Sequence, residues 1–298
     1  MAERLFAVLA ERGVLEIAGE DRVAFLQGLV SNDVAKVAPE RAIYAALLTA
    51  QGRYLFDFFI TVQGEALYLD TEAARRDDLK RRLGLYKLRS KVRIADASDR
   101  FILAVAFGAG AAAALGLPEL PGAARPFGGG VAYVDPRLAS LGLRLLLPRA
   151  AGTAALAASG FAPDDAAAYD RLRLALGVPD GSRDLPVEKA LLLEAGFDEL
   201  NGIDWQKGCY MGQELTARTK YRALIKKRLL PVAVEGPLPA PGTLVTLDGA
   251  EAGEIHSGSD GRALALLRLE AVAAAQNGAR LIAGAARVRP EKPGWAKF

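Results

Sequence analysis

The sequence predicts an α+β protein, with two similar α+β units followed by a small antiparallel β-barrel. Strand-like segments alternate with segments that have the apolar period of helices as far as residue 228. After that point, short strands recur at the spacing typical of a barrel. A proline cluster, Pro237, Pro239 and Pro241, follows the first of these strands and marks a change of composition. We therefore expect one region over residues 1–228 and a barrel over residues 229–298.

The first α+β unit is expected to have the order β-α-β-β-α-β, which is that of a split βαβ (ferredoxin-like) unit. Glu20 and Asp21 precede the first helix, where acidic residues are common. Gln51-Gly52-Arg53 and Gly64-Glu65 are turn signals between strands. The expected strands are Val14–Ile17, Ile43–Leu48, Tyr54–Val62, Ala66–Asp70 and Val92–Ala95, and the expected helices are Arg22–Leu29 and Glu72–Leu83.

We expect a second α+β unit to begin near residue 100, and segments of one unit can belong to the sheet of the other. Its expected strands are Phe101–Phe107, Val131–Val134 and Leu143–Leu147, and its expected helices are Ala111–Leu115, Gly152–Ser159 and Ala166–Leu176. The barrel strands are expected at Leu229–Glu235, Thr243–Leu247, Gly253–His256, Arg262–Leu269, Ala279–Ile282 and Ala286–Val288.

Composition excludes several classes of site. The 298 residues carry a net charge of +3, so a nucleic-acid role would need a local basic patch. One cysteine and one histidine are too few for an intramolecular disulfide or for a Cys/His metal cage, so we expect no permanently bound metal. The longest apolar run, Ala109–Leu117, is too short to span a bilayer. Met1–Gly13 lacks the apolar core of a signal peptide, so we expect a cytoplasmic protein.

The segment Lys207–Glu214 surrounds the single cysteine and carries the clearest chemical signal. Gly208 and Gly212 permit sharp backbone turns and close approach of a ligand. Cys209 precedes an expected helix, Glu214–Thr219, and lies two residues after Lys207. Both features would favour a thiolate. The alternative from residue types is a buried, inert cysteine in a tight turn.

The octet Lys207-Gly208-Cys209-Tyr210-Met211-Gly212-Gln213-Glu214 resembles the KGCYxGQE signature of the YgfZ family, the folate-binding relatives of the glycine-cleavage T-protein that act in iron–sulfur cluster assembly or repair. The similarity extends over most of the chain. The other similar segments are Phe25–Gly28 with Ser31–Val34, Gln51–Arg53 with Leu55–Asp57, Tyr86–Val92, Ala217–Arg218 with Lys220–Arg222, and Gly253–Gly258. The resemblance implies a T-protein-like ring of two ferredoxin-like subdomains plus the barrel, with residues 1–228 as the folate-binding region.

The resemblance also implies site residues. Cys209 would be a redox-active or cluster-contacting thiol, with Lys207 beside it; because one thiolate cannot hold a cluster, any cluster would be shared or transient. Tetrahydrofolate or a derivative would need a stacking ring and cations for its glutamate tail. Ala175 replaces the pterin-contacting glutamate of the T-protein, which argues against full aminomethyl transfer. The implied ligand-binding residues are Asp57, Tyr169, Tyr210, Gln213, Glu214, Arg218 and Arg222.

Three functions follow as hypotheses. The first is a folate-binding accessory factor that serves iron–sulfur client or carrier proteins. The second is a folate-dependent one-carbon transferase, so enzymatic activity stays open. The third is a non-enzymatic module for RNA or tRNA modification, based on the basic run Arg218, Lys220, Arg222, Lys226, Lys227 and Arg228. This run has a single interleaved aromatic, Tyr221, so RNA is the less favoured partner. We expect no membrane partner.

Overall fold

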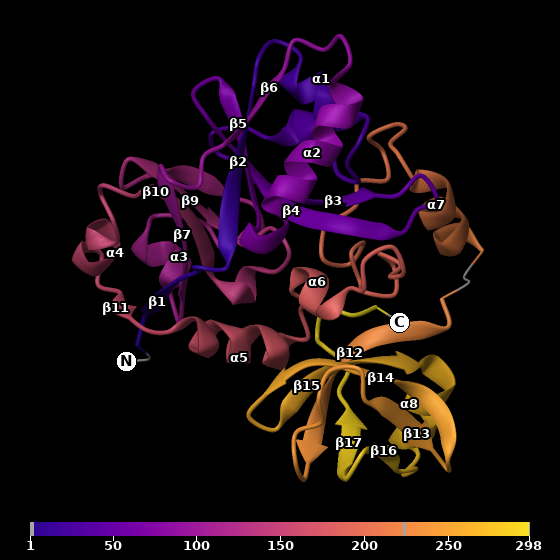
Figure 1. The fold of residues 1–298 in the computed structure, drawn as a ribbon. Helices are drawn as coiled ribbons and strands as arrows, with labels where there is room; N and C mark the ends of the chain where they lie inside the picture. Colours follow the sequence, from indigo (N-terminus) through magenta and orange to yellow (C-terminus); the bar gives the residue numbers. More distant parts are fainter. Residues whose placement is uncertain (1–2, 223–224, 298) are drawn as a thin grey trace. The chain divides into compact units, whose positions relative to one another are not determined.

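The computed structural model describes residues 3–222 and 225–297 and confirms the α+β class with a closed C-terminal barrel (Figure 1). The chain forms two compact units, each assembled from separate stretches of sequence. Unit 1 comprises Met1–Leu48, Phe56–Tyr169 and Leu200–Met211, and unit 2 comprises Thr49–Leu55, Asp170–Glu199 and Gly212–Phe298. The boundary that we expected near residue 228 remains a proposal.

The first sheet has five strands in the order β3-β4-β5-β2-β6. They coincide with the five strand segments expected from the sequence, which are one more than the β-α-β-β-α-β order of a split βαβ unit contains. These strands are β3 (Ile43–Leu48), β4 (Tyr54–Gln63), β5 (Ala66–Glu72), β2 (Arg12–Ala18) and β6 (Arg93–Asp96). The associated helices are α1 (Arg22–Gln27), the 3₁₀ turns η1 (Val34–Lys36) and η2 (Ala73–Arg75), and α2 (Arg76–Lys87).

Helix α2 lies four residues further along the chain than the sequence predicted. Its buried positions, Leu79 and Leu83, are those of the expected apolar stripe. Its ends differ because β5 continues to Glu72 and the turn η2 occupies the next three residues. As a result, the helix extends beyond the stripe into residues that do not face the core.

The second sheet contains a strand that the sequence analysis did not assign. Strand β1 (Leu5–Val8) pairs antiparallel with β7 (Phe101–Phe107), so the N-terminal segment belongs to the second sheet and the subdomains interleave. A four-residue strand between charged residues has too short a pattern to be recognised in isolation. The remaining strands are β8 (Ala124–Phe127), β9 (Gly130–Val134), β10 (Leu143–Pro148) and β11 (Ala162–Pro163), and the helices are α3 (Ala111–Ala114), α4 (Ala154–Ala158) and α5 (Ala166–Leu176).

Alternation along β10 separates an apolar face from a charged one. Leu143, Leu145 and Leu147 belong to an apolar core that also includes residues of α3 and α4. Arg144 lies between them in sequence and is also buried. Successive side chains of a strand point to opposite faces of the sheet, so Arg144 faces away from this apolar core. A cationic side chain there needs a buried partner.

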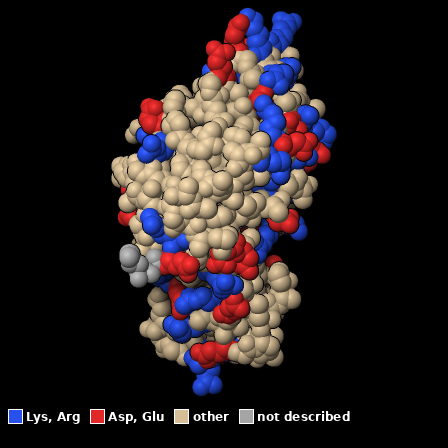
Figure 2. Space-filling view, turned by 90° about the vertical axis from the view of Figure 1, so that its left-hand side faces the viewer, with Lys and Arg blue, Asp and Glu red and all other residues tan. Residues whose placement is uncertain are grey.

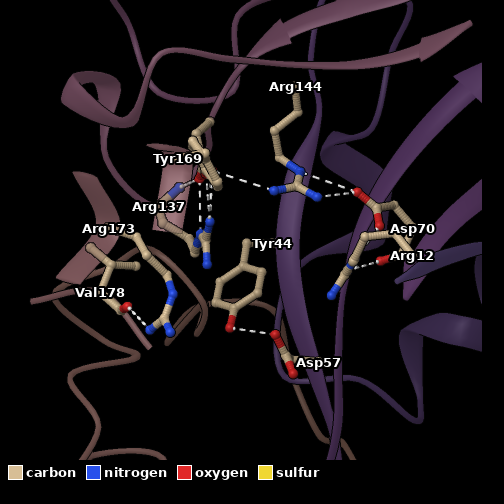
Figure 3. A network of polar contacts seen from close by, with 10 residues as sticks. Arg12, Tyr44, Asp57, Asp70, Arg137, Arg144, Tyr169, Arg173 and Val178 are labelled. Carbon is tan, nitrogen blue, oxygen red and sulfur yellow. Dashed lines mark hydrogen bonds and ion pairs between the residues drawn. The ribbon is translucent and has the colours of Figure 1, made fainter. Parts of the chain in front are cut away.

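That partner is Asp70 of β5, which lies in the other sheet of unit 1 (Figure 3). Arg144 Nη2 donates to Asp70 Oδ2 at 2.6 Å, and Arg12 Nε of β2 donates to Asp70 Oδ1 at 2.6 Å. Burial would raise the pKa of the Asp70 carboxyl, but the two guanidinium groups hold it below its usual range. The guanidinium carbon of Arg144 also lies 3.9 Å from the ring centroid of Phe59. This ion pair joins the two sheets.

The barrel closes in the order β12-β15-β14-β13-β16-β17. Its strands are β12 (Lys227–Glu235), β13 (Leu244–Leu247), β14 (Ala250–Ser259), β15 (Arg262–Arg268), β16 (Leu281–Ala283) and β17 (Ala286–Pro290). Helix α8 (Leu269–Gln276) was not predicted, and it contributes Ala271 and Val272 to the barrel core. Unit 2 also contains α6 (Gly181–Asp184) and α7 (Gln213–Tyr221). Within residues 3–222 and 225–297, no helix is both long enough and apolar enough to cross a membrane.

Replacing Asp70 by Asn tests the ion pair between the sheets. Asp70→Asn removes the carboxylate that the buried guanidinium groups of Arg12 and Arg144 share, so the free energy of unfolding should fall by about 3–5 kcal/mol. Urea unfolding followed by circular dichroism measures this change. Asp78→Asn is the control, because Asp78 pairs with Arg82 on the partly exposed face of α2 and should change stability by about 0.5 kcal/mol. Equal effects of the two substitutions would contradict this role for Asp70.

Candidate functional site

The backbone of the cysteine segment depends on its two glycines. Gly208 has φ = 89° and Gly212 has φ = 79°, values in the left-handed region that L-residues rarely adopt. Gly212 occupies the N-cap position of α7, so the helix begins directly after it. Cys209 is therefore held in the loop before α7, as the sequence predicted for a cysteine that precedes a helix.

Lys207 attaches this loop to the end of helix α1. Its Nζ donates to the carbonyl oxygens of Gln27 at 2.6 Å and of Val30 at 2.5 Å. The Met211 amide donates to the carbonyl oxygen of Gly28 at 3.1 Å. Carbonyl groups at the C-terminus of a helix lack partners within the helix, and a lysine there satisfies them. Lys207 and Met211 thus hold the loop at positions on either side of Cys209.

Burial lowers the pKa of the Lys207 amine to about 8, although Asp33 and Asp204 act in the opposite direction. The protonated amine has three N–H donors and the neutral amine has two, so either form can donate to the carbonyl oxygens of both Gln27 and Val30. The amine also lies 5.1 Å from the ring centroid of Tyr210. These contacts show that Lys207 positions the loop that carries Cys209.

The family-like segment Ser31–Val34 also contacts the chain that leads to the cysteine loop. Ser31 Oγ donates to the Gly202 carbonyl at 2.6 Å, and Asn32 Nδ2 donates to the Asn201 carbonyl at 2.7 Å. The Gln27 side chain links the two segments, because its Nε2 donates to the Lys207 carbonyl at 3.4 Å and to Asp33 Oδ1 at 2.8 Å, while its Oε1 accepts from the Val34 amide. Residues 27–34 thus hold residues 201–211 through polar contacts.

Cys209 is exposed. The alternative of a buried, inert cysteine therefore does not hold. A free thiol at the surface can reach an external partner, and a thiolate is a soft ligand for iron. As the single cysteine of the chain, it offers one such ligand.

Two of the residues expected to bind folate, Tyr169 and Asp57, are packed into the interior. The side chain of Tyr169 is 6% exposed, its ring centroid is 5.8 Å from that of Phe107, and its hydroxyl lies 3.4 Å from Arg137 and from Asp135 (Figure 3). Asp57 is buried and accepts a hydrogen bond from the Tyr44 hydroxyl at 2.8 Å. Stacking on a pterin requires an accessible ring face, so Tyr169 as packed here does not fit that role.

The remaining expected residues lie in or beside α7. Gln213 is its first residue, and Arg222 is its C-cap. Glu214 forms an exposed i,i+4 pair with Arg218, whose Nη2 is 2.5 Å from Glu214 Oε1. These exposed side chains form a charged helix surface, and their role in ligand binding remains a prediction.

Much of the basic run is neutralised by neighbouring acids. Besides the Glu214–Arg218 pair, Lys220 pairs with Asp198 at 2.6 Å, and the buried Arg228 pairs with Glu199 at 2.7 Å. On the face shown in Figure 2, Lys and Arg side chains likewise stand beside Asp and Glu side chains. A nucleic-acid surface needs unpaired cations, so this arrangement gives the RNA hypothesis little support.

Sequence reasoning did not find a buried polar cluster in unit 2. Asp184 accepts from Arg173 Nη1 at 2.8 Å and from the Ser257 amide at 3.0 Å. His256 lies in the bulged part of β14, lines a pocket of about 120 Å³ with Glu194, and has no partner for Nε2 within the described residues. Burial lowers the pKa of His256 and raises that of Glu194. These residues are far apart in sequence, so no local pattern connects them.

Lys207→Met should loosen the cysteine loop without unfolding the protein. The substitution leaves the carbonyl groups of Gln27 and Val30 without their donor, which should lower the free energy of local opening by about 1–3 kcal/mol. Hydrogen exchange at the Met211 amide measures this opening. Lys220→Met is the matched control, because it removes an exposed ion pair from α7. Unchanged protection of the Met211 amide in Lys207→Met would contradict the positioning role.

Comparison with known proteins gives matches at the level of the barrel, the fold and the whole chain. A family model described as "CAF17, C-terminal beta-barrel domain" matches residues 226–298. The crystal structure of glycine cleavage system aminomethyltransferase T from Bartonella henselae superposes with a TM-score of 0.78, covering 99% of this chain and 86% of that chain. Its sequence identity is 17%, so this likeness shows the fold and nothing about activity.

The sequence relatives cover most of the chain. The protein named "Iron-sulfur cluster assembly factor IBA57, mitochondrial" from Mus musculus is 34% identical over 288 residues, and the Homo sapiens protein of the same name is 35% identical over 280 residues. Each alignment covers 88% of this chain and 76% of the relative. The relatives are mitochondrial by name, which contradicts the cytoplasmic location predicted above. At this identity and coverage, the chain belongs to the IBA57 family.

Proposed function

We propose that this protein is an accessory factor for the assembly or repair of iron–sulfur proteins, with Cys209 as its working thiol. Relatives at 34% and 35% identity are named iron–sulfur cluster assembly factors, which supports the process. The observation that carries the role of Cys209 is that the single cysteine is exposed on a loop secured by Lys207 and Met211. The octet Lys207–Glu214 also resembles the YgfZ signature, which supports the same role for Cys209.

The number of ligands limits what Cys209 can do. Iron–sulfur clusters are held by several thiolates or imidazoles, and this chain has one cysteine and one buried histidine. The remaining ligands must therefore come from a partner, which we take to be an iron–sulfur client or carrier protein. In this proposal the cluster is the cargo, and Cys209 contacts it while the partner holds it. The exposed position of the thiol suits such an encounter.

Cys209→Ala should lower the activity of cluster-dependent enzymes in cells to the level of a strain that lacks the protein. The physical reason is the loss of the chain's single soft ligand. Enzyme activities in cell extracts, measured at equal amounts of the variant protein, provide the readout. Tyr221→Ala is the control, because Tyr221 is an exposed side chain at the end of α7 and carries no thiol. Full activity with Cys209→Ala would refute the proposed role.

Folate is the proposed small ligand, supported by the likeness to the aminomethyltransferase fold. The packing of Tyr169 gives this proposal no support, so no chemical step is assigned to folate. Asp57 is the more informative residue to change, because Asp57→Asn removes its charge and keeps an oxygen that accepts from Tyr44.

Titration calorimetry with tetrahydrofolate should show saturable binding to the wild type and binding at least tenfold weaker to Asp57→Asn. A carboxylate that hydrogen-bonds a ligand contributes about 1.5–3 kcal/mol, which corresponds to at least this factor. Asp78→Asn, on α2, should bind as the wild type does. The absence of binding to the wild type would remove folate from the proposal and leave the thiol role in place.

A further inference from the structure

Helix α2 ends in an exposed segment that the proposed function does not use. Leu85 is 65% exposed, Tyr86 is 43% exposed and Leu88 is 89% exposed. Leu85–Arg89, which we name the α2 knob, overlaps the family-like stretch Tyr86–Val92. Isolated apolar side chains are common on protein surfaces, but three large ones within four residues are characteristic of a contact surface.

The backbone at Leu88 is strained. Leu88 follows the last residue of α2 with φ = 42° and ψ = −112°, a combination that a leucine rarely adopts. Such a residue persists where the surrounding structure fixes it, and these residues are concentrated at functional sites. The strain directs a large apolar side chain into solvent rather than into the core, so core packing does not explain it.

The neighbouring backbone fixes the knob from outside the helix. The Lys91 amide donates to Asp21 Oδ2 at 2.7 Å, and Lys91 Nζ pairs with Glu20 at 2.8 Å. Gly19 has φ = 113°, and a Cβ atom there would lie 2.1 Å from the Lys91 carbonyl oxygen. The chain before α1 therefore packs directly against the chain after the knob. A loop fixed in this way loses little conformational entropy when a partner binds.

The knob carries positive charge of its own. Lys87 and Arg89, on either side of Leu88, are exposed and form no ion pair within the residues that the structure describes. Elsewhere on α2, Arg81 and Arg82 both pair with Asp78. Unpaired cations around an apolar centre complement a partner that has carboxylates around an apolar pocket.

Helix α1 connects the knob to the cysteine loop. Asp21, directly before α1, accepts from the Lys91 amide, and Gln27, the last residue of α1, accepts from Lys207. Helix α1 has six residues, so it is about 9 Å long. Both elements lie in unit 1 and are attached to opposite ends of one short helix. A protein bound at the knob would therefore lie close to Cys209.

We propose that the α2 knob is the docking point for the iron–sulfur protein whose cluster meets Cys209. Leu88 inserts into an apolar pocket of that protein, and Lys87 and Arg89 face carboxylates at the rim of the pocket. This inference rests on the proposed function and adds the surface that brings the partner to the thiol. A few central apolar side chains with a charged rim are the usual anatomy of such a contact.

Site-specific photo-crosslinking in cells tests the docking surface. A photoreactive amino acid at position 88 should form an adduct with an iron–sulfur protein, and Lys87→Glu with Arg89→Glu in the same chain should abolish the adduct. The same photoreactive residue at position 120 is the matched control, because Leu120 is 62% exposed and lies in unit 1. The crosslinked protein is then purified, and its affinity is measured directly. Leu88→Asp should weaken binding at least tenfold.

Several outcomes would overturn the docking proposal: no adduct, the same adduct from position 120, an adduct with a second copy of this chain, or unchanged affinity of Leu88→Asp. Binding of the wild type, but not of Leu88→Asp, to anionic phospholipid vesicles would also overturn it in favour of a membrane contact. Leu88→Asp should keep the circular dichroism spectrum and the urea unfolding midpoint of the wild type, which shows that the fold is intact.

The docking proposal and the proposed function can fail separately. Cys209→Ala should retain full affinity for the crosslinked protein and lose cellular activity, whereas Leu88→Asp should lose both. If Cys209→Ala lowers activity and Leu88→Asp binds normally, the docking surface is wrong and the thiol role stands. If Cys209→Ala retains full activity, the proposed function is wrong, whatever the crosslinking shows.

Discussion

The contact of Lys207 with the end of helix α1 determines the geometry of the candidate site. Its amine donates to two carbonyl groups, those of Gln27 and Val30, and thereby couples the cysteine loop to a segment about 180 residues earlier. Gly208 and Gly212, on either side of Cys209, have positive φ and allow the chain to turn sharply before and after the cysteine. The thiol is exposed although the residues around it are fixed. An exposed thiol in a fixed position is suited to a transient encounter with a cluster held by another protein.

The residues that hold the cysteine loop belong to unit 1, whose two sheets are joined by a buried ion pair. Arg144 of one sheet and Arg12 of the other share the carboxylate of Asp70, so burial of each charge depends on the others. The fold likeness to an aminomethyltransferase shows that this architecture is compatible with very different sequences, since identity is 17%. Function has to be argued from the site, and the buried ring of Tyr169 gives pterin stacking no support.

Much of the fold was predictable because long strands and helices carry strong periodic patterns. The strands at Ile43–Leu48 and Phe101–Phe107 and the helix at Ala166–Leu176 have the bounds that the sequence predicted. Strand β1 and helix α8 were missed because one is four residues long and the other is rich in alanine, with little apolar contrast between its faces. The start of α2 was misplaced because a 3₁₀ turn replaces its first residues.

The site was predictable in its residue types and not in its contacts. Two glycines and a cysteine identified the loop, but the acceptors of Lys207 are backbone carbonyl groups, which carry no sequence signal. Burial of Tyr169 was not visible either, because an aromatic residue on a helix has the same pattern whether it packs in a core or stacks on a ligand. The positive φ of Leu88 lies next to the tertiary contact between Gly19 and the Lys91 backbone, and local sequence patterns do not reveal such a contact.

The most direct test of the central claim is the electronic spectrum of a cluster in the presence of this protein. A cluster-loaded iron–sulfur protein is mixed anaerobically with the wild type or with Cys209→Ser, and thiolate-to-iron charge-transfer absorption is recorded as a function of concentration. The account predicts a saturable spectral change with the wild type and none with Cys209→Ser. Identical spectra for the two proteins would contradict the proposal that Cys209 contacts the cluster.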